Sequence, residues 1–117
     1  MSEALNQAKA AASAEEVPVG AVAVYDGKLI ARAHNLVESK QDATMHAELI
    51  VLREAASILK RWRLSDVDIF VTLEPCPMCA SALMLSRVRT VYFGAKDPRI
   101  GACGSLFDLS QHAAMPH

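Results

Sequence analysis

The first third of the chain moves from a helical to an extended hydrophobic pattern. Residues 3–14 are rich in alanine, with apolar positions spaced to line one side of a helix. Val17–Val24 and Lys28–His34 are mostly apolar and predict two strands. Asp26-Gly27 between them is typical of a two-residue hairpin turn. We therefore expect a helix followed by a β-hairpin.

The middle of the chain predicts one long amphipathic helix, from about Thr44 to Arg61. On a helical wheel the polar residues Arg53, Glu54, Ser57, Lys60 and Arg61 fill one arc. The opposite, apolar arc holds Val51, Leu52, Ala55, Ala56, Ile58 and Leu59. Glu48 falls within the apolar arc, and His46 lies just inside the predicted start. A carboxylate that points toward a core is costly unless a proton, a metal-bound water or a ligand satisfies it.

The last part of the pattern predicts two further strands around a second helix. Val67–Leu73 and Thr90–Ala95 are the strands, and Pro77 suits the first turn of the helix between them. That helix has almost no polar face, which predicts burial all round and a subunit interface. A short helical stretch is expected from Ser105. The order β-β-α-β-α-β predicts an α/β fold of three layers, α/β/α, with a central mixed sheet that begins with a hairpin and helices on both faces.

Composition narrows the class of protein. The chain has 117 residues, 52% of them hydrophobic, and a net charge of −1, which fits a single globular domain over 1–117. No stretch has the length of a membrane span or the pattern of a signal peptide. Three cysteines do not make a disulfide framework, so we expect a cytoplasmic protein with no membrane partner.

Two short motifs carry the candidate chemistry: His46-Ala-Glu48 and Pro75-Cys-Pro-Met-Cys79. Together they form the H-x-E … P-C-x-x-C signature of zinc nucleobase deaminases. One imidazole and two thiolates give Zn²⁺ three protein ligands and leave a fourth position open, as in catalytic sites. Cys76 and Cys79 lie at a predicted helix N-terminus, which favours thiolates. The alternative is a core histidine beside a redox or buried C-x-x-C pair, and Cys103 is expected to be a small packing residue rather than a fourth ligand.

Around these motifs the chain resembles the cytidine deaminase-like superfamily and, within it, the bacterial tRNA-specific adenosine deaminases (the TadA family). The resemblance runs from about Glu16 to His112. Its further landmarks are Glu16-Val-Pro-Val-Gly-Ala21, Asn35, Arg63-Leu64, Val71-Thr-Leu-Glu74, Ser86-Arg87, Phe93-Gly-Ala-Lys-Asp97 and Gly101-Ala-Cys-Gly-Ser-Leu106. The chain departs from the family pattern in two places. It has Ala43-Thr44-Met45 where the family has Pro-Thr-Ala. The family also continues beyond His117 with a final strand and helix, so we expect the chain to be shortened at its C-terminus relative to the family.

The resemblance implies hydrolytic deamination of adenosine to inosine at the wobble position of a tRNA anticodon loop. It implies one Zn²⁺ per chain on His46, Cys76 and Cys79, with Glu48 as general acid and base and no organic cofactor. Asn35, Ala47, Leu73 and Asp97 would contact the substrate. The implied partners are a tRNA anticodon stem-loop and a second copy of the chain in a homodimer.

Two alternatives remain open from the residues. A deaminase of a free base or nucleoside, such as guanine, cytosine or cytidine, would share the same zinc motif. A catalytically idle, zinc-stabilised RNA-binding protein is the alternative from another class, and Glu48 argues against it because a structural zinc site has no use for that carboxylate. Without the resemblance, Asn35 fits a turn residue about as well, and Asp97 before Pro98 fits an Asx-turn or helix cap.

Overall fold

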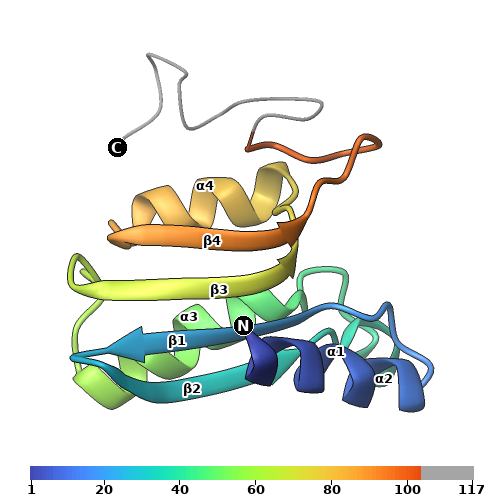
Figure 1. The fold of residues 1–117 in the computed structure, drawn as a ribbon, viewed down its shortest axis with the longest axis horizontal. Coiled ribbons are helices and arrows are strands. Elements are labelled where there is room, and N and C mark those ends of the chain that lie inside the picture. The colour runs from blue at the N-terminus through green and yellow to red at the C-terminus, as the bar shows by residue number, and fades with distance from the viewer. Residues whose placement is uncertain (104–117) are drawn as a thin grey trace.

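The computed structural model describes residues 1–103 and contains one four-stranded mixed sheet in the order β2-β1-β3-β4 (Figure 1). The strands are β1 (Gly20–Tyr25), β2 (Lys28–His34), β3 (Val67–Leu73) and β4 (Thr90–Ala95). β1 pairs antiparallel with both β2 and β3, and β3 pairs parallel with β4. The helix expected from Ser105 lies outside the described residues. The three-layer α/β fold predicted from the sequence is confirmed.

Helices cover both faces of this sheet. The helices of the described residues are α1 (Ser2–Ser13), the short α2 (Val37–Lys40), α3 (Ala47–Leu59) and α4 (Pro77–Leu85). Gly20 lies under α1, so closely that a side chain there would collide with Ala4 and Ala8. Ala21 and Ala23 point to the opposite face, because side chains alternate along a strand, and they belong to the core with residues of α3. α1 therefore covers one face, while α3 lies behind the sheet in Figure 1.

The hairpin between β1 and β2 forms as the sequence predicts. Tyr25 pairs with Lys28, so Asp26 and Gly27 are the two loop residues. Both have positive φ, 52° and 73°, which is the left-handed backbone that a type I′ turn needs and that Asp-Gly supplies readily. The register shifts between Ala23 and Val24, which marks a β-bulge in the same hairpin.

Four details of the elements differ from the prediction. The first strand begins at Gly20 instead of Val17, because Pro18 lacks an N–H and Val17 is 55% exposed. The predicted 44–61 helix is shorter at both ends, Ala47–Leu59, and stops at Lys60 in a left-handed conformation. Helix α2 was not predicted. Ile58, expected on the apolar arc, is 54% exposed.

The second long helix is only partly buried. Cys79, Ala80 and Leu83 of α4 are buried, whereas Leu85 at its end is 59% exposed. Within the single chain this helix is only partly covered, and burial of its remaining surface in a subunit interface stays a prediction. No helix among residues 1–103 has the length and apolar character needed to cross a membrane.

Candidate functional site

His46 ends a tight turn that leads into α3. Thr44 donates both its N–H and its hydroxyl to Oδ1 of Asp42, at 2.9 and 2.7 Å, and Met45 N–H donates to the Asp42 carbonyl. His46 itself is the N-cap of α3, with an extended backbone at φ −78° and ψ 148°. It therefore lies just before the helix, not inside its start as predicted, and its side chain is free of interior helix geometry.

The two cysteines are held by the start of α4. Cys76 is the N-cap, Pro77 occupies the first helical turn, and Cys79 lies within that turn with its side chain fully buried. Proline fits there because the first N–H groups of a helix have no intrahelical partner. The N-terminal end of the helix dipole also favours negative charge, so this position suits a thiolate.

These three side chains converge on one point. Nδ1 of His46 lies 3.6 Å from Sγ of Cys76 and 3.4 Å from Sγ of Cys79, and the three ligand atoms lie within 4.8 Å of one another. Two soft sulfurs and one imidazole nitrogen at this spacing fit a tetrahedral metal such as zinc. Cys103 is not a member of this ligand group. The arrangement can hold a metal ion.

Hydrogen bonds among the two thiols and the imidazole shift their pKa values, downward for Cys76 and upward for Cys79 and His46. The hydrogen bond from Cys79 is the largest cause that lowers the pKa of Cys76, to about 4. The same contact, together with burial, raises the pKa of the Cys79 thiol. The hydrogen bond to Cys76 raises the pKa of His46, against the effect of burial. A metal that binds here must displace the proton of Cys79, so binding releases protons.

Glu48 lies in the first turn of α3, and its side chain is 4% exposed. Burial raises the pKa of its carboxyl above the ordinary range. A carboxyl with a raised pKa beside a metal-ligand cluster holds a proton more readily than an ordinary glutamate and can pass it to a neighbouring group. The apolar arc of the predicted helix located this buried carboxyl correctly.

One cavity of about 300 Å³ contains these groups. It is lined by His46, Glu48 and Cys76, and also by the four predicted substrate residues, namely Asn35, Ala47, Leu73 and Asp97. These residues come from the ends of β2 and β3, the starts of α3 and α4, and the segment after β4. The structure thus brings every predicted site residue except the fully buried Cys79 to the wall of one cavity.

Two of the cavity residues also have local structural roles. Oδ1 of Asn35 accepts the N–H of Val37 at 3.2 Å, which fixes the start of α2. Oδ1 of Asp97 accepts the N–H of Arg99 at 3.0 Å, and the Arg99 guanidinium lies 3.6 Å from the same oxygen. The turn interpretations of both residues therefore hold alongside their place in the cavity.

The sequence singled out no role for two buried glutamates of the cavity wall. Glu16 accepts the N–H groups of Glu38 and Ser39 at 2.9 and 2.7 Å, and also the Ser39 hydroxyl. Glu74 accepts the N–H groups of Asp97 and Cys103 at 3.1 and 2.9 Å. Their place in the sequence could have marked them, because each glutamate directly precedes a motif. Glu16 precedes Val-Pro-Val-Gly, and Glu74 precedes Pro-Cys-Pro.

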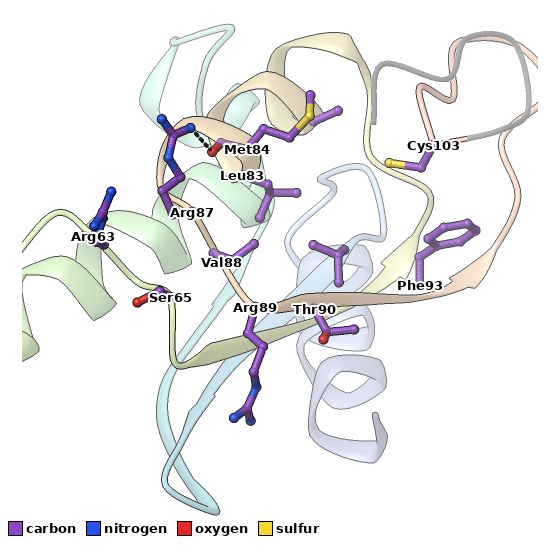
Figure 2. A pocket seen from close by; sticks show the side chains of 12 residues that line it. Arg63, Ser65, Leu83, Met84, Arg87, Val88, Arg89, Thr90, Phe93 and Cys103 are labelled. Carbon is purple, nitrogen blue, oxygen red and sulfur yellow. Dashed lines mark hydrogen bonds between the residues drawn. The ribbon is translucent and has the colours of Figure 1, made fainter. Parts of the chain in front are cut away.

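A second, larger cavity of about 740 Å³ lies between α4 and β4. Figure 2 shows Leu83, Met84 and Phe93 around it, with Arg63 and Arg87 near its edge. Arg87 donates to the carbonyl of Met84 at 3.2 Å, and Cys103 lies at the opposite end. This cavity is mainly apolar and contains none of the metal-ligand or acid–base residues.

Comparisons with known proteins show the family of the chain. The model of the MafB19-like deaminase family matches residues 1–111. A structure from a study of A-to-I editing by tRNA:A34 deaminases at the wobble position of transfer RNA superposes with a TM-score of 0.97. It is 44% identical, over 100% of this chain and 90% of that one. A guanine deaminase from Bacillus subtilis superposes at 0.78 with 35% identity, over 81% of this chain and 61% of that one. The fold is that of the deaminases, a class of enzymes.

Two curated relatives narrow the family. The tRNA-specific adenosine deaminase of Bacillus subtilis is 51% identical over 117 residues, which is 100% of this chain and 73% of that protein. The chloroplastic tRNA(adenine(34)) deaminase of Arabidopsis thaliana is 56% identical over 109 residues, 93% of this chain but 8% of that much longer protein. The chain belongs to the family of tRNA-specific adenosine deaminases.

Proposed function

We propose that this chain converts adenosine to inosine at the wobble position of a tRNA anticodon loop, using one Zn²⁺ held by His46, Cys76 and Cys79. The observation that supports it most strongly is that the buried carboxyl of Glu48 lines the same cavity as the metal-ligand cluster. The choice of substrate is supported by the relatives, two of which are tRNA-specific or tRNA(adenine(34)) deaminases.

A zinc ion on these three ligands would supply Lewis acidity that lowers the pKa of water at the open position. The chain's own residues would prepare that position. His46 presents Nδ1 to both sulfurs, and the N-terminus of α4 stabilises the negative charge of Cys76 and Cys79. Two thiolates also balance the two positive charges of the ion, so the buried cluster carries little net charge.

Glu48 would carry out the proton transfers of the reaction. It takes a proton from the attacking water as the oxygen adds to C6 of adenine, and gives a proton to the ring nitrogen. It then assists the departure of the amino group as ammonia, which leaves inosine. Its raised pKa suits this relay, because a carboxyl with a raised pKa takes the proton of the water more readily than an ordinary glutamate and holds it until the ring nitrogen accepts it.

The substrate would be held by the remaining residues of the cavity wall. The amide of Asn35 would bond the edge of the base, and the backbones of Ala47 and Leu73 would hold its face and rim. Asp97 would contact the sugar of a flanking nucleotide. The support for these contacts is that all four residues line the same cavity of about 300 Å³ as Glu48. A loop nucleotide suits such a cavity because it is already unstacked.

The competing function is deamination of a free base. The guanine deaminase neighbour shares the fold at a TM-score of 0.78, so the fold alone does not separate the two. The test is to incubate the zinc-loaded protein with an anticodon stem-loop, with guanine and with cytidine. We expect a mass gain of about one dalton at one adenosine of the stem-loop, since an amino group becomes a carbonyl. Turnover of guanine or cytidine with none on the stem-loop would favour the competing function.

We further propose a homodimer that uses α4 and β4. The support is apolar surface at the end of α4, where Leu85 is 59% exposed, beside the cavity between α4 and β4 that Met84, Val91 and Phe93 line. We expect Leu85→Lys to shift the protein toward monomer in sedimentation experiments, with Ile58→Lys on α3 as the matched control. A wild-type monomer at micromolar concentration would contradict the proposal. The cytoplasmic location stays a prediction, and one relative is a chloroplastic protein.

A further inference from the structure

The carboxylate of Glu74 joins the end of β3 to both ends of the segment that follows β4. Glu74 is 2% exposed, and its own N–H donates to the carbonyl of Ala95 at 2.7 Å. Oε1 accepts the N–H of Asp97 at 3.1 Å, and Oε2 accepts the N–H of Cys103 at 2.9 Å. One side chain therefore fixes the first and the last residue of the segment Asp97–Cys103, which is called the wall segment below.

The wall segment fits against Glu74 without spare room. A Cβ atom added at Gly101 would lie 2.5 Å from Cδ and 2.6 Å from Oε2 of Glu74, and 2.5 Å from the Asp97 carbonyl oxygen. The Gly101 N–H donates to that carbonyl at 2.8 Å, and the Ala102 N–H donates to the carbonyl of Pro75 at 2.9 Å. Glycine is required at 101 because the carboxylate occupies the space that a side chain would fill.

These two hydrogen bonds of the Glu74 carboxylate, called the Glu74 brace below, connect two different parts of the site. Glu74 and Pro75 directly precede the ligand Cys76, while Asp97, Arg99 and Ile100 of the wall segment line the substrate cavity. Asp97 is itself 5% exposed and bonds Arg99, so a shift of its backbone would move both side chains. The distance between the metal cluster and this side of the cavity is thus set through Glu74.

We propose that Glu74 is a positioning residue for substrate binding: it holds the wall segment at a fixed distance from the metal-ligand segment. This inference rests on the proposed function, because it assigns Asp97 and its neighbours to the substrate side. Glu74 acts through backbone N–H groups and not on the reacting atoms. Its effect should therefore appear in the binding of a large substrate more than in the proton transfers of Glu48.

The chemistry of the brace requires a carboxylate. Each oxygen accepts a backbone N–H, and both donors are fixed by the chain. In Glu74→Gln one oxygen becomes an NH₂ group, which would face a backbone N–H, so that two donors meet and one contact is lost. The substitution keeps the size of the side chain. It therefore distinguishes the loss of a hydrogen bond from the loss of side-chain volume.

The first experiment compares zinc-loaded wild type, Glu74→Gln and Glu54→Gln on an anticodon stem-loop. Glu54 is exposed on α3, so its variant removes the same charge away from the site. For Glu74→Gln we expect one zinc per chain and a KM raised by about 10-fold, with kcat changed by less than about threefold, as for loss of one charge-assisted hydrogen bond. An unchanged KM, a fall in kcat alone, or loss of zinc would overturn the proposal.

A second variant and a second readout keep the test independent of folding and of substrate. Gly101→Ala leaves the carboxylate intact but pushes the wall segment away, so it should raise KM in the same way. Hydrogen exchange of the zinc-loaded protein should be faster at the Asp97 and Cys103 amides in Glu74→Gln, and unchanged at Ile69 in β3. Exchange equal to wild type at both amides would overturn the brace. Wild type that is inactive on the stem-loop would instead contradict the proposed function, and the exchange result would still decide the brace.

Discussion

His46 and Glu48 line the same cavity although they are only two residues apart at the start of a helix. Inside a helix, side chains at this spacing point about 200° apart and do not face each other. The pair avoids this because His46 is the N-cap, with ψ at 148°, while Glu48 is already helical. The bend of the chain at His46 therefore lets an imidazole and a carboxyl from neighbouring positions reach one site.

Glu48→Gln should remove turnover without weakening the fold. The amide keeps the size of the side chain but cannot transfer protons, and loss of a general acid–base typically lowers kcat by about 10²–10⁴-fold. Because burial already disfavours the charged carboxyl, the neutral amide should leave the thermal midpoint equal or higher. Kinetics on a stem-loop and thermal unfolding of the zinc-loaded protein measure the two effects. Turnover within about tenfold of wild type would assign the proton transfers to another group.

The ligand set predicts which cysteine substitutions release zinc. Wild type should retain about one zinc per chain after dialysis, and Cys76→Ala should lose it, because two ligands hold the ion much less tightly than three. Cys103→Ala is the matched control, since Cys103 lies outside the ligand group. Metal analysis by mass spectrometry measures the zinc content per chain of wild type and of both variants. Full zinc in Cys76→Ala, or loss in Cys103→Ala, would redefine the ligands.

The pattern of the sequence predicted the sheet better than the connections. The bounds of β2, β3 and β4 agree with the prediction, because each is a short apolar run closed by a turn residue or a proline. Helix α2 was missed because its four residues carry too little periodicity, and it depends on Glu16 and Asn35, which come from other parts of the chain. Tertiary hydrogen bonds of this kind leave no local signal.

The candidate site likewise has one part that the sequence predicts and one part that it does not. Motif spacing and the helical wheel were enough to predict the cluster of His46, Cys76 and Cys79 and the buried position of Glu48. The brace by Glu74 could not be predicted, because its partners Asp97 and Cys103 are more than twenty residues away and offer only backbone N–H groups. Any residue type except proline could supply those donors, so no pattern of side chains marks them.

Asp97→Asn should change which sugar the site tolerates. An asparagine Oδ1 can still accept the Arg99 N–H, so the turn remains, but the charged acceptor for a 2′-hydroxyl is lost. The preference for ribose over deoxyribose in a flanking nucleotide should fall by about tenfold, as for loss of one hydrogen bond to a charged group. Two stem-loops that differ in that single hydroxyl measure the ratio of kcat/KM. Asp66→Asn, at a half-buried position away from the cavity and paired with Arg61, is the control and should keep the wild-type ratio.

Glu16→Gln should destabilise the fold at neutral pH by loosening α2. The Ser39 hydroxyl is the largest cause that lowers the pKa of Glu16 below its ordinary value of 4.5, helped by the N–H groups of Glu38 and Ser39. A glutamine cannot accept all of these bonds, because its NH₂ group would meet a donor. Urea unfolding at pH 7 should therefore give a lower midpoint for the variant than for wild type, and Glu54→Gln should match wild type.

The difference between wild type and Glu16→Gln should then depend on pH in one direction. Because the folded pKa lies below the unfolded value, the folded state holds fewer protons than the unfolded state in the range between them. The stabilisation by the carboxylate is fully present above about pH 5 and is lost as the pH falls through the folded pKa. Unfolding of both proteins at about pH 7, 5 and 4 measures it, and effects of acid on the zinc site cancel because both proteins share that site. A difference that stays constant down to about pH 3, or grows with acidity, would mean that Glu16 is not held as the ionised acceptor of the α2 donors.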